Sequence, residues 1–236
     1  MVTTNPIPIK ALIGLGNIGK EFANTYHNAG FLFLDFLTEG ACPHTKRGAF
    51  GVGAWKEKRG LGFSYEKRHG MPPHQAQSIW CGGMLLIKPR GYMNESGRGA
   101  LAALDYFKLK PEEVLLAHDD SDLAVGIAKL TFGGRAAGHH GVESVIKALG
   151  TKEFWRLKIG IRPSADQRGQ DADSRGRIPR ELASSPRMKA GEFVLTPIKK
   201  EDRAKLARLF QRVSPVGNGE KTLNIFEPMA QSFKCT

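Results

Sequence analysis

The chain has 236 residues, of which 41% are hydrophobic, and no run approaches the ~18 consecutive apolar residues of a membrane-spanning helix. Its formal net charge is +12, and an excess of this sign attracts polyanions, so a nucleic acid is favoured as partner over a membrane. Three widely spaced cysteines and the absence of a secretory signal predict a reduced protein in the cytoplasm, or in mitochondria if the source is eukaryotic.

Strand-like and helical segments alternate along the chain. The sequence predicts strands at 11–15, 82–89, 113–119, 128–134, 156–161 and 192–198, and helices at 29–39, 96–108, 139–150 and 199–213. This alternation predicts a single-domain, three-layer α/β fold with a central twisted mixed sheet flanked by helices. Residues 1–213 form the expected domain, with aperiodic surface insertions at about 41–80 and 163–190, and residues 214–236 form a C-terminal tail.

A glycine-rich corner follows the first predicted strand, where Gly14, Gly16 and Gly19 fit the spacing G-x-G-x-x-G. A dinucleotide site needs, in addition, an acidic residue at the tip of a second strand. The spacing would select Asp35, but Asp35 lies within an apolar segment of helical period. A nicotinamide or flavin oxidoreductase is therefore disfavoured, and the corner is interpreted as the site of another ligand.

Short segments that contain polar residues follow the ends of several predicted strands, where the ligand crevice of an open α/β sheet lies. They are Asn17 and His27, then Met93 and Asn94, then His118, Asp119 and Asp120, and finally Gly138, His139, His140 and Gly141. A histidine base, a carboxylate that fixes its tautomer and amide donors make a hydrolytic site that needs no metal and no other cofactor. Each group also has a structural interpretation, as a buried histidine or a turn cap, and no zinc-type spacing is present.

Four ordered motifs resemble the bacterial-type peptidyl-tRNA hydrolases over about residues 10–163 and again near 192. GLGNIGKEFANTYHNAGF resembles the family's GLGNPG-x-x-Y-x-x-T-R-H-N-x-G, and KPRGYMNESG resembles KP-x-x-[FY]MN-x-SG. HDDSDLAVGIAKL is similar to HDELDLP-x-G-x-x-[KR], and GHHGVESVIKALG to GHNG-x-[KR]-x-I-x-x-LG. The family's activity is hydrolysis of the ester between a peptide, or an N-blocked amino acid, and tRNA.

The resemblance implies roles for individual residues. His27 would be the general base that activates water, Asp119 would orient it, and Asn17 would separate blocked from unblocked aminoacyl-tRNA. Tyr92 and Asn94 would contact the 3′ end of the substrate, with Met93 lining the pocket. The remaining residues expected at the substrate or the tRNA are Phe22, Gly138, His139, His140, Lys129, Arg135, Arg156 and Lys158. No cofactor and no metal are implied, the tRNA backbone would contact a basic surface, and we expect a monomer.

The chain departs from the family pattern at four positions. Ile18 replaces a proline, Phe22 a tyrosine, Tyr26 the arginine before the catalytic histidine, and His140 the asparagine of GHNG. An imidazole cannot reproduce the paired donor and acceptor of an amide. The joint presence of Asn17, His27, Asn94 and Asp119 favours the enzyme as the leading hypothesis. His140 is the one feature that favours the alternative function, an RNA-binding homologue of the same fold that has lost turnover.

Overall fold

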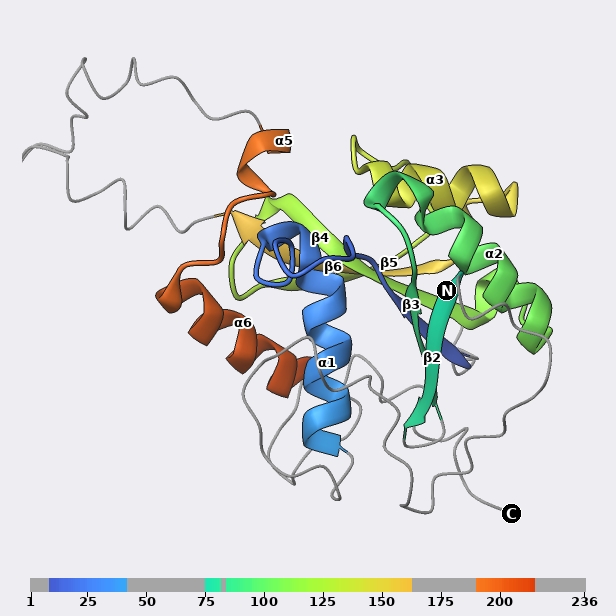
Figure 1. Ribbon diagram of the computed structural model, residues 1–236, viewed down its shortest axis with the longest axis horizontal. Helices are drawn as coiled ribbons and strands as arrows, with labels where there is room; N and C mark the ends of the chain where they lie inside the picture. Colours follow the sequence, from blue (N-terminus) through green and yellow to red (C-terminus); the bar gives the residue numbers. More distant parts are fainter. Residues whose placement is uncertain (1–8, 42–74, 82–83, 163–189, 215–236) are drawn as a thin grey trace, which may run out of the picture.

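The computed structural model describes residues 9–41, 75–81, 84–162 and 190–214. Most of the two expected insertions and nearly all of the expected tail lie outside the described residues. Six strands form one sheet in the order β2-β3-β1-β4-β6-β5 (Figure 1). Their bounds are β1 Ala11–Gly14, β2 Ala76–Cys81, β3 Met84–Pro89, β4 Val114–Ala124, β5 Ala128–Phe132 and β6 Trp155–Arg162.

The sheet is mixed, as the sequence predicts. Strand β1 runs parallel to β3 and to β4, and β4 runs parallel to β6. The outer strands β2 and β5 pair antiparallel with β3 and β6. The carboxyl ends of four adjacent strands therefore meet at one edge of the sheet, and this edge of a parallel sheet is where ligand sites form.

Two helical layers cover the two faces of the sheet (Figure 1). Helices α1 (Ala29–Ala41) and α6 (Lys200–Val213) pack on one face, and α2 (Ser96–Phe107) and α3 (His140–Leu149) on the other. Side chains of a strand alternate between faces. Leu12 accordingly joins the cluster of α1 and α6, whereas Ala11 and Ile13 join that of α2 and α3. The three-layer α/β architecture is thus confirmed.

Two predictions about secondary structure are wrong. The segment 76–81, assigned to the first insertion, forms edge strand β2. The segment 192–198 is not a strand of the sheet: it contains the end of a short helix, α5 (Ala190–Phe193), and then makes one isolated bridge between Pro197 and Thr25. The main chain of this segment bonds instead to the loop and turn at residues 24–27, and Pro197 has no N–H with which to extend the bridge.

None of the helices in the described part of the chain is long and apolar enough to span a membrane.

Candidate active site

The turn that carries His27 lies at the carboxyl end of β1. After Gly14 the chain loops out and returns through a short 3₁₀ turn, η1 (Tyr26–Asn28), into α1. Helix α1 starts very close to the strand, since a Cβ added to Gly14 would lie 2.6 Å from the carbonyl oxygen of Gly30. Glycine is required there because no side chain fits. The close approach of α1 brings the preceding turn, and with it His27, over the sheet edge.

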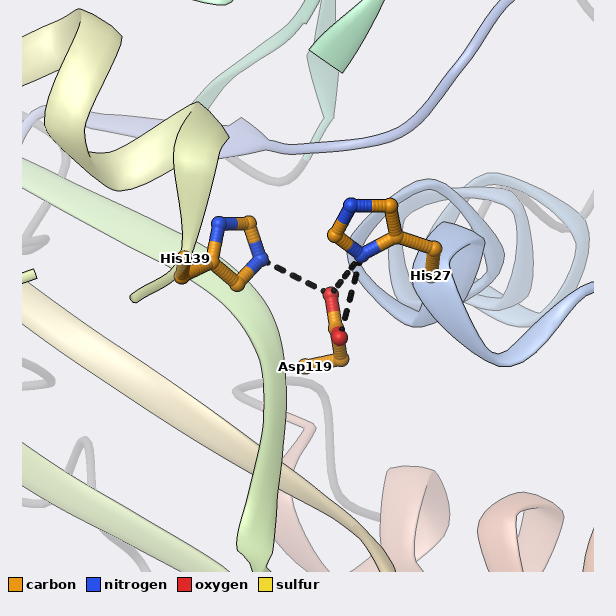
Figure 2. Close-up of side chains that lie close together, drawn as sticks. All are labelled: His27, Asp119 and His139. Atoms are coloured by element: carbon orange, nitrogen blue, oxygen red, sulfur yellow. Dashed lines mark hydrogen bonds and ion pairs between the residues drawn. The ribbon is translucent and has the colours of Figure 1, made fainter. Parts of the chain in front are cut away.

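Asp119 reaches the same place from β4. Pairing between β1 and β4 ends at Gly14 and Ala117, and β4 continues beyond it. Asp119 therefore lies beyond the end of β1, where its backbone still pairs with Ile159 of β6 and its carboxylate contacts the η1 turn. Nδ1 of His27 lies 2.9 Å from Oδ1 and 3.1 Å from Oδ2 of Asp119 (Figure 2). Both side chains are buried, with 9% of His27 and 4% of Asp119 exposed.

His139 is a second histidine on the same carboxylate. Its Nε2 lies 2.8 Å from Oδ1 of Asp119, and its ring centroid lies 4.9 Å from that of His27 (Figure 2). His139 is also the N-cap of α3, because its Nδ1 accepts from the backbone N–H groups of Gly141 and Val142. An accepting Nδ1 carries no hydrogen, so the hydrogen of the neutral ring is on Nε2 and is donated to Asp119.

These contacts fix the tautomer of His27 as well. A carboxylate only accepts, so Nδ1 of His27 carries the hydrogen and Nε2 keeps its lone pair. Burial alone would raise the pKa of Asp119, but His139 and the hydrogen bonds from His139 and His27 outweigh it and hold this pKa well below its usual range. Asp119 is therefore an anion at any working pH, and Nε2 of His27 is a base.

The same cluster has the composition of a metal site, since donor atoms of His27, Asp119 and His139 all lie within 4.8 Å of one another. A metal ligand must offer a lone pair. Nε2 of His139 offers none while Nδ1 caps α3, and Nδ1 of His27 offers none while it donates to Asp119. The arrangement fits a hydrogen-bonded dyad with a second donor better than it fits a cation.

Asn17 is held beside this cluster by two other residues. Its Oδ1 accepts from the backbone N–H of Met93 at 2.7 Å, so its Nδ2 remains as the donor end of the amide. The side chain of Asn28 then clamps the main chain of Asn17, because Oδ1 accepts from the N–H at 2.8 Å and Nδ2 donates to the carbonyl oxygen at 3.0 Å. Only 7% of Asn17 and 2% of Asn28 are exposed.

Asn28 was not among the site residues predicted from the sequence. Its signal was its position directly after His27, in a turn where the next residues begin a helix. A buried asparagine there can serve the backbone of a neighbouring loop, as asparagine side chains commonly do in turns.

A comparison with known families matches residues 11–218 to the family model described as peptidyl-tRNA hydrolase. The chain belongs to the peptidyl-tRNA hydrolase family. It is therefore a member of a family of hydrolase enzymes, and the resemblance inferred from the four motifs is confirmed.

Solved structures of peptidyl-tRNA hydrolases share the fold. The enzyme from Acinetobacter baumannii is 24% identical, with a TM-score of 0.60, over 87% of this chain and 85% of that one. A single-site mutant of the Acinetobacter baumannii enzyme has a TM-score of 0.61 at 23% identity, over 87% and 85% of the two chains. A complex of peptidyl-tRNA hydrolase with n-propanol has a TM-score of 0.59 at 24% identity, again over 87% and 85%.

The other residues expected at the substrate lie around the cluster with different exposure. Met93 is buried beside Asn17, whereas Tyr92 is 58% exposed and Asn94 is exposed. Phe22 is half-buried in the loop before His27, and its carbonyl oxygen accepts from Thr25. Gly138 is exposed, with φ of +81°, which suits glycine.

His140 points away from the buried cluster. Its side chain is 76% exposed, and Nδ1 lies 3.9 Å from the carboxylate of Glu143 one turn along α3. The position at which the chain departs from the family's asparagine thus lies in solvent, next to an exposed acid.

The basic residues expected at the tRNA fall into two groups. Lys129 and Arg135 are exposed. Lys158, in contrast, forms an ion pair with Asp120 at 2.9 Å. Arg156 is only 4% exposed, and its guanidinium donates to the carbonyl oxygens of Gly133 and Arg135. Arg156 thus supports the loop that leads to His139, which differs from the expected contact with tRNA phosphate.

Proposed function

We propose that this protein hydrolyses the ester bond of peptidyl-tRNA, with His27 as the general base. The observation that carries the proposal is the buried His27–Asp119 pair, whose geometry puts the hydrogen of the neutral ring on Nδ1 and the lone pair on Nε2 of His27. It occurs in a chain that matches the peptidyl-tRNA hydrolase family over residues 11–218.

In the proposed reaction, Nε2 of His27 takes a proton from a water molecule, which attacks the ester carbonyl carbon. Asp119 stabilises the imidazolium that forms, because it remains ionised. Nδ2 of Asn17 donates to the acyl part of the substrate, since Oδ1 of the same amide already accepts from the backbone N–H of Met93. The ester bond then breaks, and the ribose hydroxyl of tRNA leaves with the proton that His27 returns.

The test is cleavage of diacetyl-lysyl-tRNA by the purified protein. His27→Ala should lower kcat by roughly 10²–10⁴-fold with little change in tRNA affinity, because a general base acts in the transition state. Asp119→Asn should also lower kcat and move the acid limb of the pH–rate profile to lower pH, since the imidazolium loses its adjacent anion. His27→Ala with activity within about threefold of wild type would overturn the assignment.

The same assay distinguishes the alternative, an RNA-binding homologue that has lost turnover. Such a protein would bind the substrate without cleaving it, and His140→Asn would restore cleavage. The exposure of His140 favours the enzyme, because a side chain in solvent beside Glu143 does not obstruct the dyad. We expect His140→Asn to leave kcat within about twofold of wild type.

We further propose that exposed cations bind the tRNA backbone. Lys129→Glu should weaken tRNA binding and lower the slope of log affinity against log salt by about one, as expected for the loss of one phosphate contact. Lys158→Glu should change the slope less, because Lys158 is already paired with Asp120. Equal slopes in wild type and Lys129→Glu would assign tRNA binding to another surface.

A further inference from the structure

The segment at residues 194–198, between α5 and α6, packs directly on the turn that carries His27. The backbone N–H of His27 donates to the carbonyl oxygen of Val194 at 2.8 Å, and that of Tyr26 donates to Thr196 at 3.3 Å. In the other direction, the N–H of Ile198 donates to Asn24 at 2.8 Å. The main chain around His27 is thus bonded to residues 194–198, which lie far away in the sequence and connect α5 to α6 (Figure 1).

Tyr26 is the side chain that joins these two segments. Its hydroxyl donates to Oδ2 of Asp202 at 2.6 Å, and its ring stacks on Phe193 with centroids 4.7 Å apart. Only 1% of Tyr26 is exposed. Burial, together with the hydrogen bond to Asp202, holds the pKa of Tyr26 well above its usual range, so the hydroxyl keeps its proton and acts as the donor.

Asp202 is also buried, with 2% exposed, in the first turn of α6. Its other oxygen lies 3.9 Å from Nζ of Lys205. Helix α6 is fixed independently of this contact, because Phe210 packs on Phe33 and Phe36 of α1. The hydrogen bond from Tyr26 to Asp202 therefore attaches the turn before α1 to a helix that is held by its own packing.

We propose that Tyr26 and Asp202 are positioning residues for His27, an inference that rests on the hydrolase function proposed above. The η1 turn is only three residues long, and a turn of this length does not fix its own geometry. Nε2 of His27 must point at a water molecule while Nδ1 stays on Asp119. A displacement of about 1 Å at such a site can lower a rate by about 10²-fold. The Tyr26–Asp202 bond opposes that displacement, because it ties the residue before His27 to α6.

The test compares four variants in the full-length protein. Tyr26→Phe keeps the stacking on Phe193 but removes the donor, and Asp202→Ala removes the acceptor. Both should lower kcat about five- to twentyfold at temperatures well below unfolding, with KM within about twofold of wild type. Asp202→Asn should recover most of kcat, because its amide oxygen still accepts from Tyr26. The double variant Tyr26→Phe/Asp202→Ala should be no slower than the slower single variant.

Phe210→Leu is the matched control. It weakens the packing of the last turn of α6 on α1 but changes neither partner of the Tyr26–Asp202 bond, which lies at the first turn of α6, so it should lower the melting temperature and leave kcat unchanged. Wild-type kcat in Tyr26→Phe would overturn the proposal. It would also be overturned if Phe210→Leu lost as much kcat for a given loss of stability as Tyr26→Phe does.

A second measurement does not depend on turnover. Proton NMR would follow the Nδ1 proton of His27, which is hydrogen-bonded to Asp119, and the absence of its signal in His27→Ala would assign it. We expect Tyr26→Phe and Asp202→Ala to shift or broaden this signal, and Phe210→Leu to leave it in place. If the wild-type protein cleaves no ester, the hydrolase proposal fails, while this signal still decides the positioning role. An unchanged signal in Tyr26→Phe and Asp202→Ala would contradict it.

Discussion

His139 donates to Asp119 from Nε2 and, from the other side of the same ring, caps α3 through Nδ1. The first helical turn of α3 and the carboxylate that orients His27 are therefore linked through one imidazole. Loss of this ring should affect stability and catalysis separately, because the two contacts use different nitrogen atoms.

Two substitutions at His139 separate these contacts. His139→Ala removes both, and should lower the free energy of unfolding by about 1 kcal/mol, as for other lost N-caps, and kcat by about tenfold. His139→Asn restores a good N-cap but has a shorter side chain than the one that now reaches Asp119, so stability should recover while kcat stays low. Urea unfolding and steady-state kinetics measure the two effects. Full activity in His139→Asn would show that the donor to Asp119 is dispensable.

The clamp of Asn28 on Asn17 predicts a different pattern. Asn28→Ala leaves the N–H and the carbonyl oxygen of Asn17 without these partners in a buried site, at a cost of about 1–3 kcal/mol for each. Because Asn17 is proposed to read the blocked end of the substrate, the ratio of rates on blocked and unblocked aminoacyl-tRNA should also fall. Asn28→Asp keeps the acceptor and loses the donor, and should be intermediate in stability. A variant that is destabilised but keeps full discrimination would show that the clamp only stabilises the fold.

The sequence predicted the parts of the structure that depend on local pattern. The corner from β1 to α1, the parallel strands and the positions of His27 and Asp119 follow from hydrophobic period and from glycine. It did not predict contacts set by tertiary packing. The second donor to Asp119, from His139, and the clamp from Asn28 depend on which loops meet in space. The assignment of 192–198 as a strand was wrong because its apolar residues pack beside the His27 turn, where no neighbouring strand is available.

Lys88, at the end of β3, forms a buried ion pair with Asp35 of α1, and we expect this pair to affect the stability of the fold away from the His27–Asp119 dyad. Both residues are under a tenth exposed, at 7% and 8%, and Nζ of Lys88 also lies 5.1 Å above the ring of Phe31. Lys88→Met leaves the carboxylate of Asp35 without this cation, which typically costs about 3–5 kcal/mol. Lys88→Met/Asp35→Leu should recover much of that loss, as thermal unfolding would measure. A double variant less stable than Lys88→Met would show that Asp35 stabilises this site through contacts other than the one with Lys88.

His118 makes the stability of the protein depend on pH. It is 3% exposed, its Nδ1 donates to the carbonyl oxygen of Asp119 at 2.7 Å, and its Nε2 has no hydrogen-bond partner in the described part of the chain. Burial, with a smaller contribution from His139, lowers the pKa of His118 to about 3. In the unfolded chain a histidine titrates near pH 6.5.

Between these two values the unfolded chain binds a proton that the native protein does not. Stability therefore falls as pH falls, by up to about 1.4 kcal/mol per pH unit from this group alone, and the effect vanishes above the unfolded value. Asp119 adds to it only below about pH 4, where an aspartate of the unfolded chain takes up a proton while the native carboxylate, with its depressed pKa, stays ionised. His118→Asn keeps an N–H donor in the place of Nδ1 but does not titrate. Its unfolding free energy, measured in urea from pH 7 to pH 4, should be lower than wild type at neutral pH and should fall less steeply with acid. Parallel curves for the two proteins would mean that His118 takes up a proton in the native state as readily as in the unfolded chain.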